Sequence, residues 1–190
     1  MSTEVENIFR AAGAILEGHF QLTSGLHSAT YWEKFRVLQY PHYTEQLCSI
    51  IARHFRDKGV EVVAGPALGG IIIAFEVARQ LGIRYIIAER EGDGRAFKRG
   101  FTIARGERVL IVDDVLTTGT SVLEVIKAVR KLGGEPIGVG VLVDRSQGRT
   151  TFDVPLFSCY QVAIPTYAPE QCPLCARRVP LTKPGSSPKR

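Results

Sequence analysis

The chain has 190 residues, 45% of them hydrophobic and 23% charged, which is enough to bury the core of one enzyme-sized domain. No apolar stretch approaches the roughly 20 residues that a membrane-spanning helix needs, and the N-terminus does not resemble a signal peptide, so we expect a cytoplasmic protein with no membrane partner. The net charge of +5 would suit a nucleic-acid-binding protein, but five of the 24 basic residues follow Ala176, and the other 19 balance the 19 acidic residues. We therefore expect no nucleic-acid partner.

The N-terminal third combines two predicted helices, an aromatic segment and one strand. Apolar residues at helical spacing predict helices over residues 4–17 and 42–58. Residues 18–32, between them, are rich in aromatic side chains and turn signals and have no regular period. Residues 60–64 predict a buried strand.

A glycine-rich loop, residues 65–70, joins this strand to a helix predicted over residues 71–81. Gly69 and Gly70 let the backbone come close to a bound group, and the amides at the start of a helix attract anions. The loop is therefore a candidate phosphate site, although a plain tight turn explains the same residues.

A charged segment, residues 89–101, follows a strand predicted over residues 85–88. Its Asp93-Gly94 dipeptide indicates a hairpin turn, so we interpret the segment as a mobile β-ribbon. Mixed charge on a ribbon is typical of a solvent-exposed surface. The alternative is contact with an anionic substrate by three of its cations, Arg90, Lys98 and Arg99.

The most informative stretch is residues 109–121, Val-Leu-Ile-Val-Asp-Asp-Val-Leu-Thr-Thr-Gly-Thr-Ser. Its first four residues predict a strand buried on both faces, and Asp113 and Asp114 end that strand. The loop that follows carries four hydroxyl side chains and Gly119, and it leads directly into a helix predicted over residues 121–132. Hydroxyls and free helix amides are suited to binding a phosphate. The carboxylates are suited to a sugar diol, a bound Mg²⁺ or a developing cation beside that phosphate.

Two further strands are predicted over residues 137–143 and 157–164. The alternation of strands and helices predicts an α/β fold with a mainly parallel sheet. Asp144 and Arg145 stand at the end of the first of these strands, where ligands bind in open α/β sheets. The Arg145 guanidinium either pairs with Asp144 or is available to an anionic ligand.

The C-terminal region contains the motif Cys172-Pro-Leu-Cys175. A structural zinc site needs four ligands, and the chain's other cysteines and its four histidines are scattered along the sequence. We therefore expect no structural metal site made by the protein alone, and a redox or inter-subunit role for the motif stays open.

Residues 109–121 closely resemble the phosphoribosyl-pyrophosphate (PRPP) motif of type I phosphoribosyltransferases. Residues 18–32, which contain Phe-Gln-Leu-Thr-Ser-Gly-Leu-His-Ser-Ala-Thr-Tyr, resemble the hood segment of orotate phosphoribosyltransferases. The resemblance extends to the loop at 65–70, to a short form of the family's flexible catalytic ribbon, and to the pair Asp144-Arg145. It covers nearly the whole chain.

This resemblance implies a type I phosphoribosyltransferase fold over residues 1–176, with a mainly parallel central sheet flanked by helices. A small N-terminal hood would occupy about residues 1–40, and residues 177–190 would form a basic, flexible tail. The implied reaction converts orotate and PRPP into orotidine 5′-monophosphate and diphosphate, in pyrimidine biosynthesis. Mg²⁺ would enter with PRPP, and a homodimer would let each ribbon reach into the neighbouring site.

The resemblance also implies individual roles. The acidic pair would hold the ribose hydroxyls, and the threonine–glycine loop would wrap the 5′-phosphate. The residues implied for PRPP are Asp113, Asp114, Val115, Leu116, Thr117, Thr118, Gly119, Thr120, Ser121, Arg90, Gly69 and Gly70. Orotate would contact Thr117 and Arg145, and the catalytic residues would be Asp113, Asp114, Lys98 and Arg99.

Three departures from the family pattern leave other functions open. Thr23 stands where a lysine is common, Leu68-Gly69 replaces Tyr-Lys, and the ribbon lacks a histidine. One alternative is a phosphoribosyltransferase for another base, such as a purine, because the PRPP motif fixes only the sugar donor. The other is a PRPP-sensing regulator without turnover, which the missing lysines favour. Asp144-Arg145 and the hood segment favour a carboxylated pyrimidine.

Overall fold

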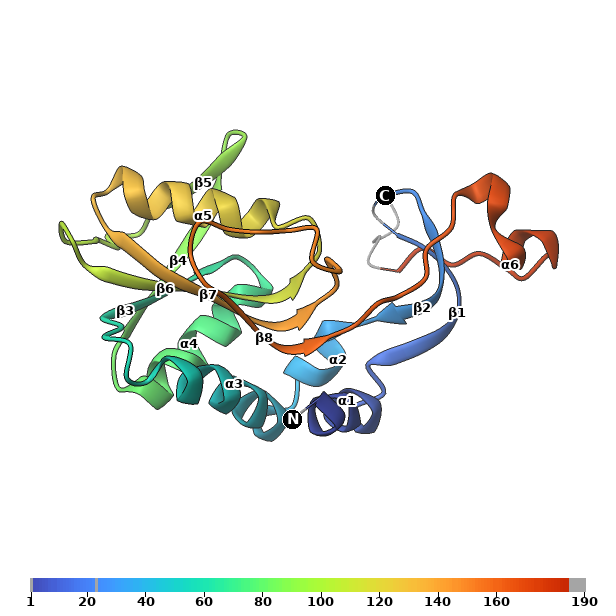
Figure 1. The fold of residues 1–190 in the computed structure, drawn as a ribbon, viewed down its shortest axis with the longest axis horizontal. Helices are drawn as coiled ribbons and strands as arrows, with labels where there is room; N and C mark the ends of the chain where they lie inside the picture. The colour runs from blue at the N-terminus through green and yellow to red at the C-terminus, as the bar shows by residue number, and fades with distance from the viewer. Residues whose placement is uncertain (1, 23, 185–190) are drawn as a thin grey trace.

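The computed structural model describes residues 2–22 and 24–184, which form a large α/β body and a smaller hood beside it (Figure 1). The body contains a six-stranded sheet in the order β5-β4-β3-β6-β7-β8. Five strands are parallel and β5 is an antiparallel edge. Their bounds are β3 (Val62–Pro66), β4 (Arg84–Glu91), β5 (Gly94–Phe97), β6 (Arg108–Leu116), β7 (Glu135–Asp144) and β8 (Leu156–Gln161). The predicted α/β class with a mainly parallel sheet is confirmed.

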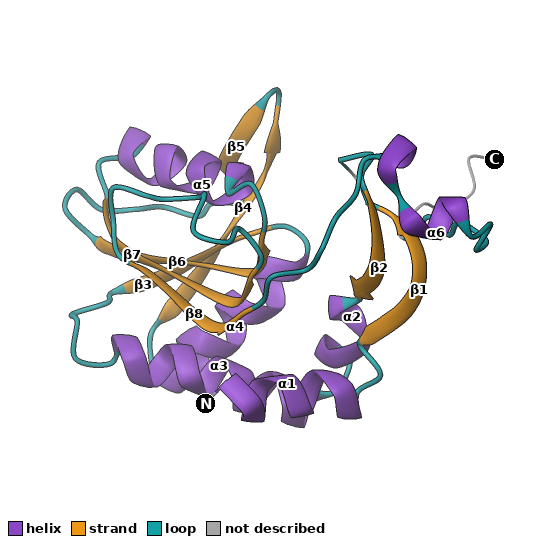
Figure 2. Ribbon diagram, turned by 45° about the vertical axis from the view of Figure 1, so that its right-hand side comes forward, coloured by secondary structure: helices purple, strands orange, loops and turns teal. Residues whose placement is uncertain are grey.

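Helices cover both faces of this sheet (Figure 2). Helices α3 (Pro41–Phe55) and α4 (Gly69–Leu81) pack on one face, and α5 (Thr120–Lys131) packs on the other. In β6, Leu110 and Val112 join the first core cluster and Val109 and Ile111 the second. This alternation explains why the strand is apolar at every position, as in a sheet buried on both sides.

The hood is built from α1 (Ser2–Ala11), the antiparallel pair β1 (Ile15–Gln21) and β2 (His27–Trp32), and the short helix α2 (Lys34–Leu38). The predicted helix over residues 4–17 is therefore wrong beyond Ala11. Gly13 has a φ of +62° and ends the helix, because a left-handed residue cannot continue an α-helix. The residues that follow enter β1, and the aromatic segment without a period is a hairpin.

The ribbon predicted over residues 89–101 is an antiparallel hairpin of β4 and β5. Its turn lies one residue earlier than predicted, because Glu91 pairs with Gly94 and the two loop residues are Gly92 and Asp93. The positive φ of the turn, 55°, falls on Gly92, where a residue without Cβ has no steric cost.

After β8 the chain leaves the sheet and returns to the hood, through the 3₁₀ turn η1 (Pro169–Gln171) and the short helix α6 (Pro173–Ala176). It forms an isolated bridge with each hood strand, Tyr167 with His27 and Thr182 with Phe20. Part of the segment predicted to be a flexible tail is thus held by backbone hydrogen bonds as far as Thr182. Within residues 2–22 and 24–184, no helix is both long and apolar enough to cross a membrane.

Candidate active site

A cavity of about 940 Å³ lies between the hood and the C-terminal ends of the parallel strands. The hood contributes side chains of β2 and α2, and the body contributes the loops after β6 and β7. Of the residues predicted to bind substrates, five line it: Asp114, Val115, Thr117, Thr118 and Arg145. Ends of parallel strands are where ligands bind in open α/β sheets, so the cavity is the candidate active site.

The acidic pair lies near the end of β6 but does not end it as predicted, because the strand continues through Val115 and Leu116, which pair with β7. Asp114 is buried, and its Oδ2 lies 2.7 Å from the Nζ of Lys34 on α2. Burial and the Asp114 carboxylate raise the pKa of Asp113 from 3.8 to about 7. The backbone amide of Asp114 and the cations of Lys34 and Arg95 oppose that rise. Burial and the like charge of its neighbour thus outweigh the nearby cations at Asp113.

The loop after the acidic pair is shaped for an anion. Gly119 has a φ of +76° and precedes the first residue of α5, so free amides of that helix face the loop. A Cβ at Gly119 would lie 2.5 Å from the Cγ2 of Thr150, and glycine is therefore the residue that fits. Thr117 and Thr118 are exposed at the cavity wall and offer their hydroxyls. This loop has the donors that a phosphate needs.

The second glycine-rich loop, residues 65–70, touches the acidic pair. A Cβ at Gly69 would lie 1.6 Å from the Oδ2 of Asp114, and a Cβ at Gly70 would lie 2.6 Å from the Cδ of Pro66. Side chains are thus excluded at both positions. The absence of a lysine at residue 69 has a structural cause, because the Asp114 carboxylate and the Lys34 ammonium fill that space.

Arg145 presents an unpaired guanidinium to the cavity. Among the residues that the structure describes, no carboxylate lies within ion-pair distance of it, and its buried Nε has no hydrogen-bond partner. Asp144 instead accepts a hydrogen bond of 2.7 Å from the amide of Ser146. Burial lowers the pKa of the Arg145 guanidinium. Of the two interpretations of this residue, the structure favours availability to an anionic ligand.

The predicted ribbon cations are directed away from the cavity of their own chain. Arg90 pairs with Glu124 on α5 at 3.0 Å, and Arg99 pairs with Glu89 at 2.7 Å. Lys98 lies 3.7 Å from Glu91. All three are exposed, and none is among the residues that line the cavity. The pairs of Lys98 and Arg99 are largely solvent-exposed and therefore weak, so these two cations can exchange for an anionic partner. The Glu124 side chain that Arg90 contacts is only 13% exposed.

Two cations near the site were missed by the sequence analysis. Lys34 lines the cavity and neutralises Asp114. Arg95, whose side chain is 6% exposed, pairs with Glu124 at 3.2 Å. It also donates to the carbonyl of Ala67 and to the hydroxyl of Ser121, and so links the loop at residues 65–70 to the start of α5. Arg95 stands opposite Arg90 in the ribbon, and the strand register that turns it inward has no local sequence signal. Thr23, the other position of a missing lysine, lies outside the described residues.

The expectation that the protein has no structural metal site of its own was based on the scattered positions of its histidines and cysteines in the sequence. The histidines and cysteines that are scattered along the sequence are not all scattered in space. His19 and His27 of the hood lie beside Cys172 and Cys175, with ligand atoms within 4.8 Å of one another. This cluster is outside the active-site cavity.

Comparison with known proteins agrees with this geometry. Residues 39–164 match the phosphoribosyl transferase domain family, a range that includes the six-stranded sheet, the loop at residues 65–70 and the loop before α5. The chain is 50% identical to an orotate phosphoribosyltransferase of Desulforamulus reducens and 52% identical to one of Caldanaerobacter subterraneus subsp. tengcongensis, each over 183 residues and 96% of both chains. It belongs to the orotate phosphoribosyltransferase family, as its motifs predict.

A solved structure supports the same assignment. The crystal structure of orotate phosphoribosyltransferase from Aeropyrum pernix is 27% identical, with a TM-score of 0.72 over 83% of this chain and 93% of that chain. The part of this chain that is shared with it therefore includes most of the α/β body.

The raised pKa of Asp113 predicts a distinctive pH dependence of stability. The folded protein holds this proton up to about pH 7, whereas the unfolded chain releases it near 3.8. Between these values the folded state binds more protons, so this group lowers the free energy of unfolding as the pH rises. Relative to wild type, Asp113→Asn should gain on the order of 1–4 kcal/mol between pH 4 and pH 8, at about 1.4 kcal/mol per pKa unit.

Urea denaturation of both proteins across this pH range measures the difference. Asp93→Asn, which removes an exposed carboxylate from the ribbon turn, is the control for the loss of one negative charge. A stability difference between wild type and Asp113→Asn that is constant over the range would show that Asp113 is ionised throughout.

Proposed function

We propose that this protein transfers the phosphoribosyl group from PRPP to orotate, with release of diphosphate, in the cavity between the hood and the body. The 5′-phosphate of PRPP would bind the loop at residues 117–121 and the start of α5. The ribose hydroxyls would donate to the carboxylates of Asp113 and Asp114. The diphosphate would lie along the backbone of Gly69 and Gly70.

The observation that carries the choice of orotate is the unpaired guanidinium of Arg145. A half-buried arginine with no carboxylate of its own is matched by a ligand that brings one, because the two form a bidentate, charge-assisted pair. Orotate has such a carboxylate, whereas purine bases do not. Thr117, which lines the same cavity, would contact the base.

Mg²⁺ fits this arrangement as a partner of PRPP. The acidic pair offers hard oxygen ligands of the kind that Mg²⁺ prefers, and the raised pKa of Asp113 indicates a local shortage of positive charge. When it is bound with PRPP, Mg²⁺ neutralises charge on the diphosphate. The added positive charge would favour the ionised form of Asp113, whose carboxylate could then accept from the ribose hydroxyls beside Asp114.

Lys34 supplies a cation beside residue 69, one of the two positions where the family pattern leads one to expect a lysine. Its Nζ lies 3.2 Å from the point where a Cβ of residue 69 would stand. An ammonium is therefore present where the loop at residues 65–70 meets the acidic pair, although it comes from α2. This placement supports an enzyme over a regulator that has lost its charge compensation.

The chemistry needs orientation and charge stabilisation more than a nucleophilic side chain. Displacement at the anomeric carbon separates a cationic ribosyl centre from a departing diphosphate, so preorganised charges lower the barrier. The carboxylates of Asp113 and Asp114 would lie beside the ribose, and Lys34 beside the leaving group. The described chain supplies both signs of charge at one end of the sheet.

The assay that tests this function follows orotate spectrophotometrically in the presence of PRPP and Mg²⁺. Orotate should be consumed only when both are present, because the donor loop and the carboxylate-binding arginine serve one reaction. Turnover of adenine, guanine or hypoxanthine without turnover of orotate would identify a purine enzyme. Binding of PRPP without turnover of any base would identify a regulator.

Arg145→Ala should weaken orotate binding by about 2–4 kcal/mol, the usual cost of leaving one partner of a buried charge pair alone. This is roughly 30- to 700-fold in the dissociation constant. PRPP affinity should change little. Arg145→Lys is the matched control and should recover only part of the loss, because an ammonium cannot form the bidentate pair. Equal losses for orotate and PRPP would assign Arg145 to the fold.

The ribbon cations Lys98 and Arg99 would act in the neighbouring subunit of a homodimer. Their exposed pairs with Glu91 and Glu89 leave them available to a diphosphate outside their own chain, and mobile segments commonly complete a site in this way. The double variant Lys98→Ala/Arg99→Ala should therefore lower the turnover rate far more than it weakens orotate binding.

Mixing experiments test the arrangement between subunits. The double variant, mixed with Asp113→Asn/Asp114→Asn and allowed to exchange subunits, should regain activity, because a mixed dimer contains one site with intact acids and an intact ribbon. Normal turnover of the double-alanine variant would show that the ribbon is only a solvent-exposed surface. Inactivity without rescue would show that the cations act within their own chain.

A further inference from the structure

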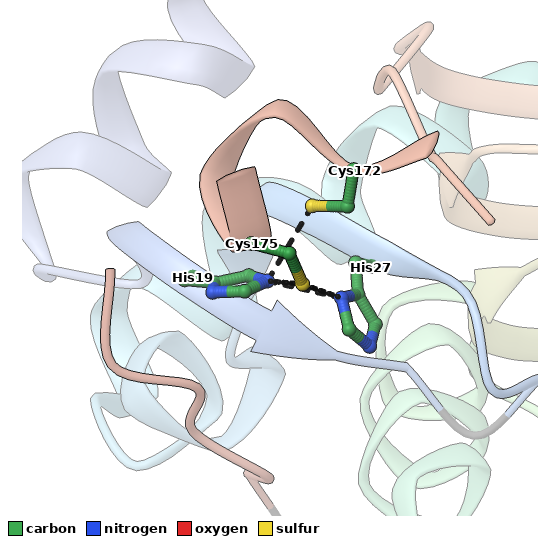
Figure 3. Close-up of side chains that lie close together, drawn as sticks. All are labelled: His19, His27, Cys172 and Cys175. Carbon is green, nitrogen blue, oxygen red and sulfur yellow. Dashed lines mark hydrogen bonds between the residues drawn. The ribbon is translucent and has the colours of Figure 1, made fainter. Parts of the chain in front are cut away.

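Four potential metal ligands meet at the outer end of the hood, where the C-terminal segment returns to the hairpin (Figure 3). His19 comes from β1 and His27 from β2, while Cys172 precedes α6 and Cys175 lies within it. His19, His27 and Cys172 are buried, and Cys175 is exposed. Both cysteines are free thiols, and all four ligand atoms point toward one centre.

Four of the six distances between these atoms are close to the edges of a tetrahedron around zinc, and all six are within 4.8 Å. The Nε2 of His19 lies 3.0 Å from the Nδ1 of His27, and 3.5 Å and 3.7 Å from the sulfurs of Cys172 and Cys175. The Cys175 sulfur lies 3.3 Å from the same Nδ1. Ordinary Zn–N and Zn–S bond lengths give tetrahedral edges of about 3.3 Å between nitrogens and about 3.6 Å between nitrogen and sulfur.

Hydrogen bonds alone do not account for this cluster. A ring nitrogen of neutral histidine has either one proton or one lone pair, yet the Nε2 of His19 has three polar neighbours. The other nitrogen of His19, Nδ1, lies 2.8 Å from the carbonyl of Val179. A carbonyl only accepts, so Nδ1 holds the proton of the neutral ring and the Nε2 lone pair faces the cluster. Such a hydrogen bond to the far ring nitrogen is typical of histidine metal ligands.

We propose that His19, His27, Cys172 and Cys175 bind one structural Zn²⁺. Two imidazoles and two thiols in a Cys-x-x-Cys spacing form the donor set and geometry that zinc prefers. On binding, both thiols release their protons to solvent, and two thiolates with two neutral imidazoles make the site electrically neutral. Four protein ligands leave no open position, so the site is structural and takes no substrate.

The zinc would fix the shape of the hood. A two-stranded sheet is marginal by itself, and here the ion would join both strands to the segment that flanks them at Tyr167 and Thr182. The same hairpin carries Leu22, Ser24, Leu26 and Tyr31 to the wall of the active-site cavity. Loss of zinc is therefore expected to loosen the base side of the cavity and to leave the loops of the central sheet intact.

Metal analysis of the full-length protein, purified without a histidine tag, tests the site. We expect about one zinc per chain. Cys175→Ser changes the exposed ligand and should lower the zinc content at least tenfold, whereas Cys159→Ala removes a free cysteine far from the cluster and should retain zinc. Well under one zinc per wild-type chain, with no uptake when Zn²⁺ is added under reducing conditions, would overturn the proposal.

Cobalt provides a second measurement that does not depend on the stability of a variant. Wild-type protein reconstituted with Co²⁺ should show the visible absorption of a tetrahedral ion and the charge-transfer absorption of thiolate ligands. If an alkylating reagent modifies both cysteines as free thiols in the zinc-loaded protein, the proposal is contradicted. A Cys172–Cys175 disulfide in freshly purified protein would also contradict it.

The consequence for catalysis rests on the proposed function and is measured separately. Removal of zinc by a chelator should raise the KM for orotate more than that for PRPP, and added Zn²⁺ should restore it. If orotate is not a substrate, the zinc content and the cobalt spectrum still test the metal site. A bound zinc whose removal leaves both KM values unchanged would refute only its influence on the cavity.

Discussion

The contact on which the active site depends is the close approach of the Asp114 carboxylate to the backbone of Gly69. No side chain fits at residue 69, because its Cβ would stand 1.6 Å from the Asp114 Oδ2. The Nζ of Lys34 lies 2.7 Å from the same oxygen and forms an ion pair with it. Three separate segments, the end of β6, the start of α4 and the start of α2, are thereby fixed relative to one another. A buried carboxylate needs such a partner.

This contact also explains the uneven charge of the site. Lys34 neutralises Asp114, and the neighbouring Asp113 is left with a pKa of about 7 because burial and a like charge act on it together. In the proposed reaction, the hydroxyls of the ligand and an accompanying cation would compensate the negative charge that the protein alone leaves unbalanced at the acidic pair. Arg145 has the opposite imbalance, since it is a half-buried cation without a partner carboxylate among the described residues. These two imbalances would suit a ligand with hydroxyls on one side and a negative group on the other.

Sequence reasoning located the parts of the candidate site that are formed by consecutive residues. The strand of β6, the acidic pair and the loop before α5 form one uninterrupted stretch, so the apolar run and Gly119 identified them directly. It failed at the end of α1, where apolar residues continue past Ala11 at helical spacing although Gly13 stops the helix. It also missed Lys34 and Arg95, because a strand register and the position of a short helix decide which cations reach the site. Nor could spacing reveal that His19 and Cys172, 153 residues apart, are neighbours.

The two halves of the cavity are stabilised by different means. On the body side, the loops follow strands of a sheet that is packed on both faces, so their positions depend on a large apolar core. The hairpin has no comparable core, and its outer part is held by backbone bridges to the C-terminal segment and by the cluster of histidines and cysteines. Since unfolding of small segments is governed by their own local contacts, the two sides can differ in rigidity. A PRPP site on the rigid side and a base site under a separately stabilised hood would allow the base side to open without loss of the phosphate loops.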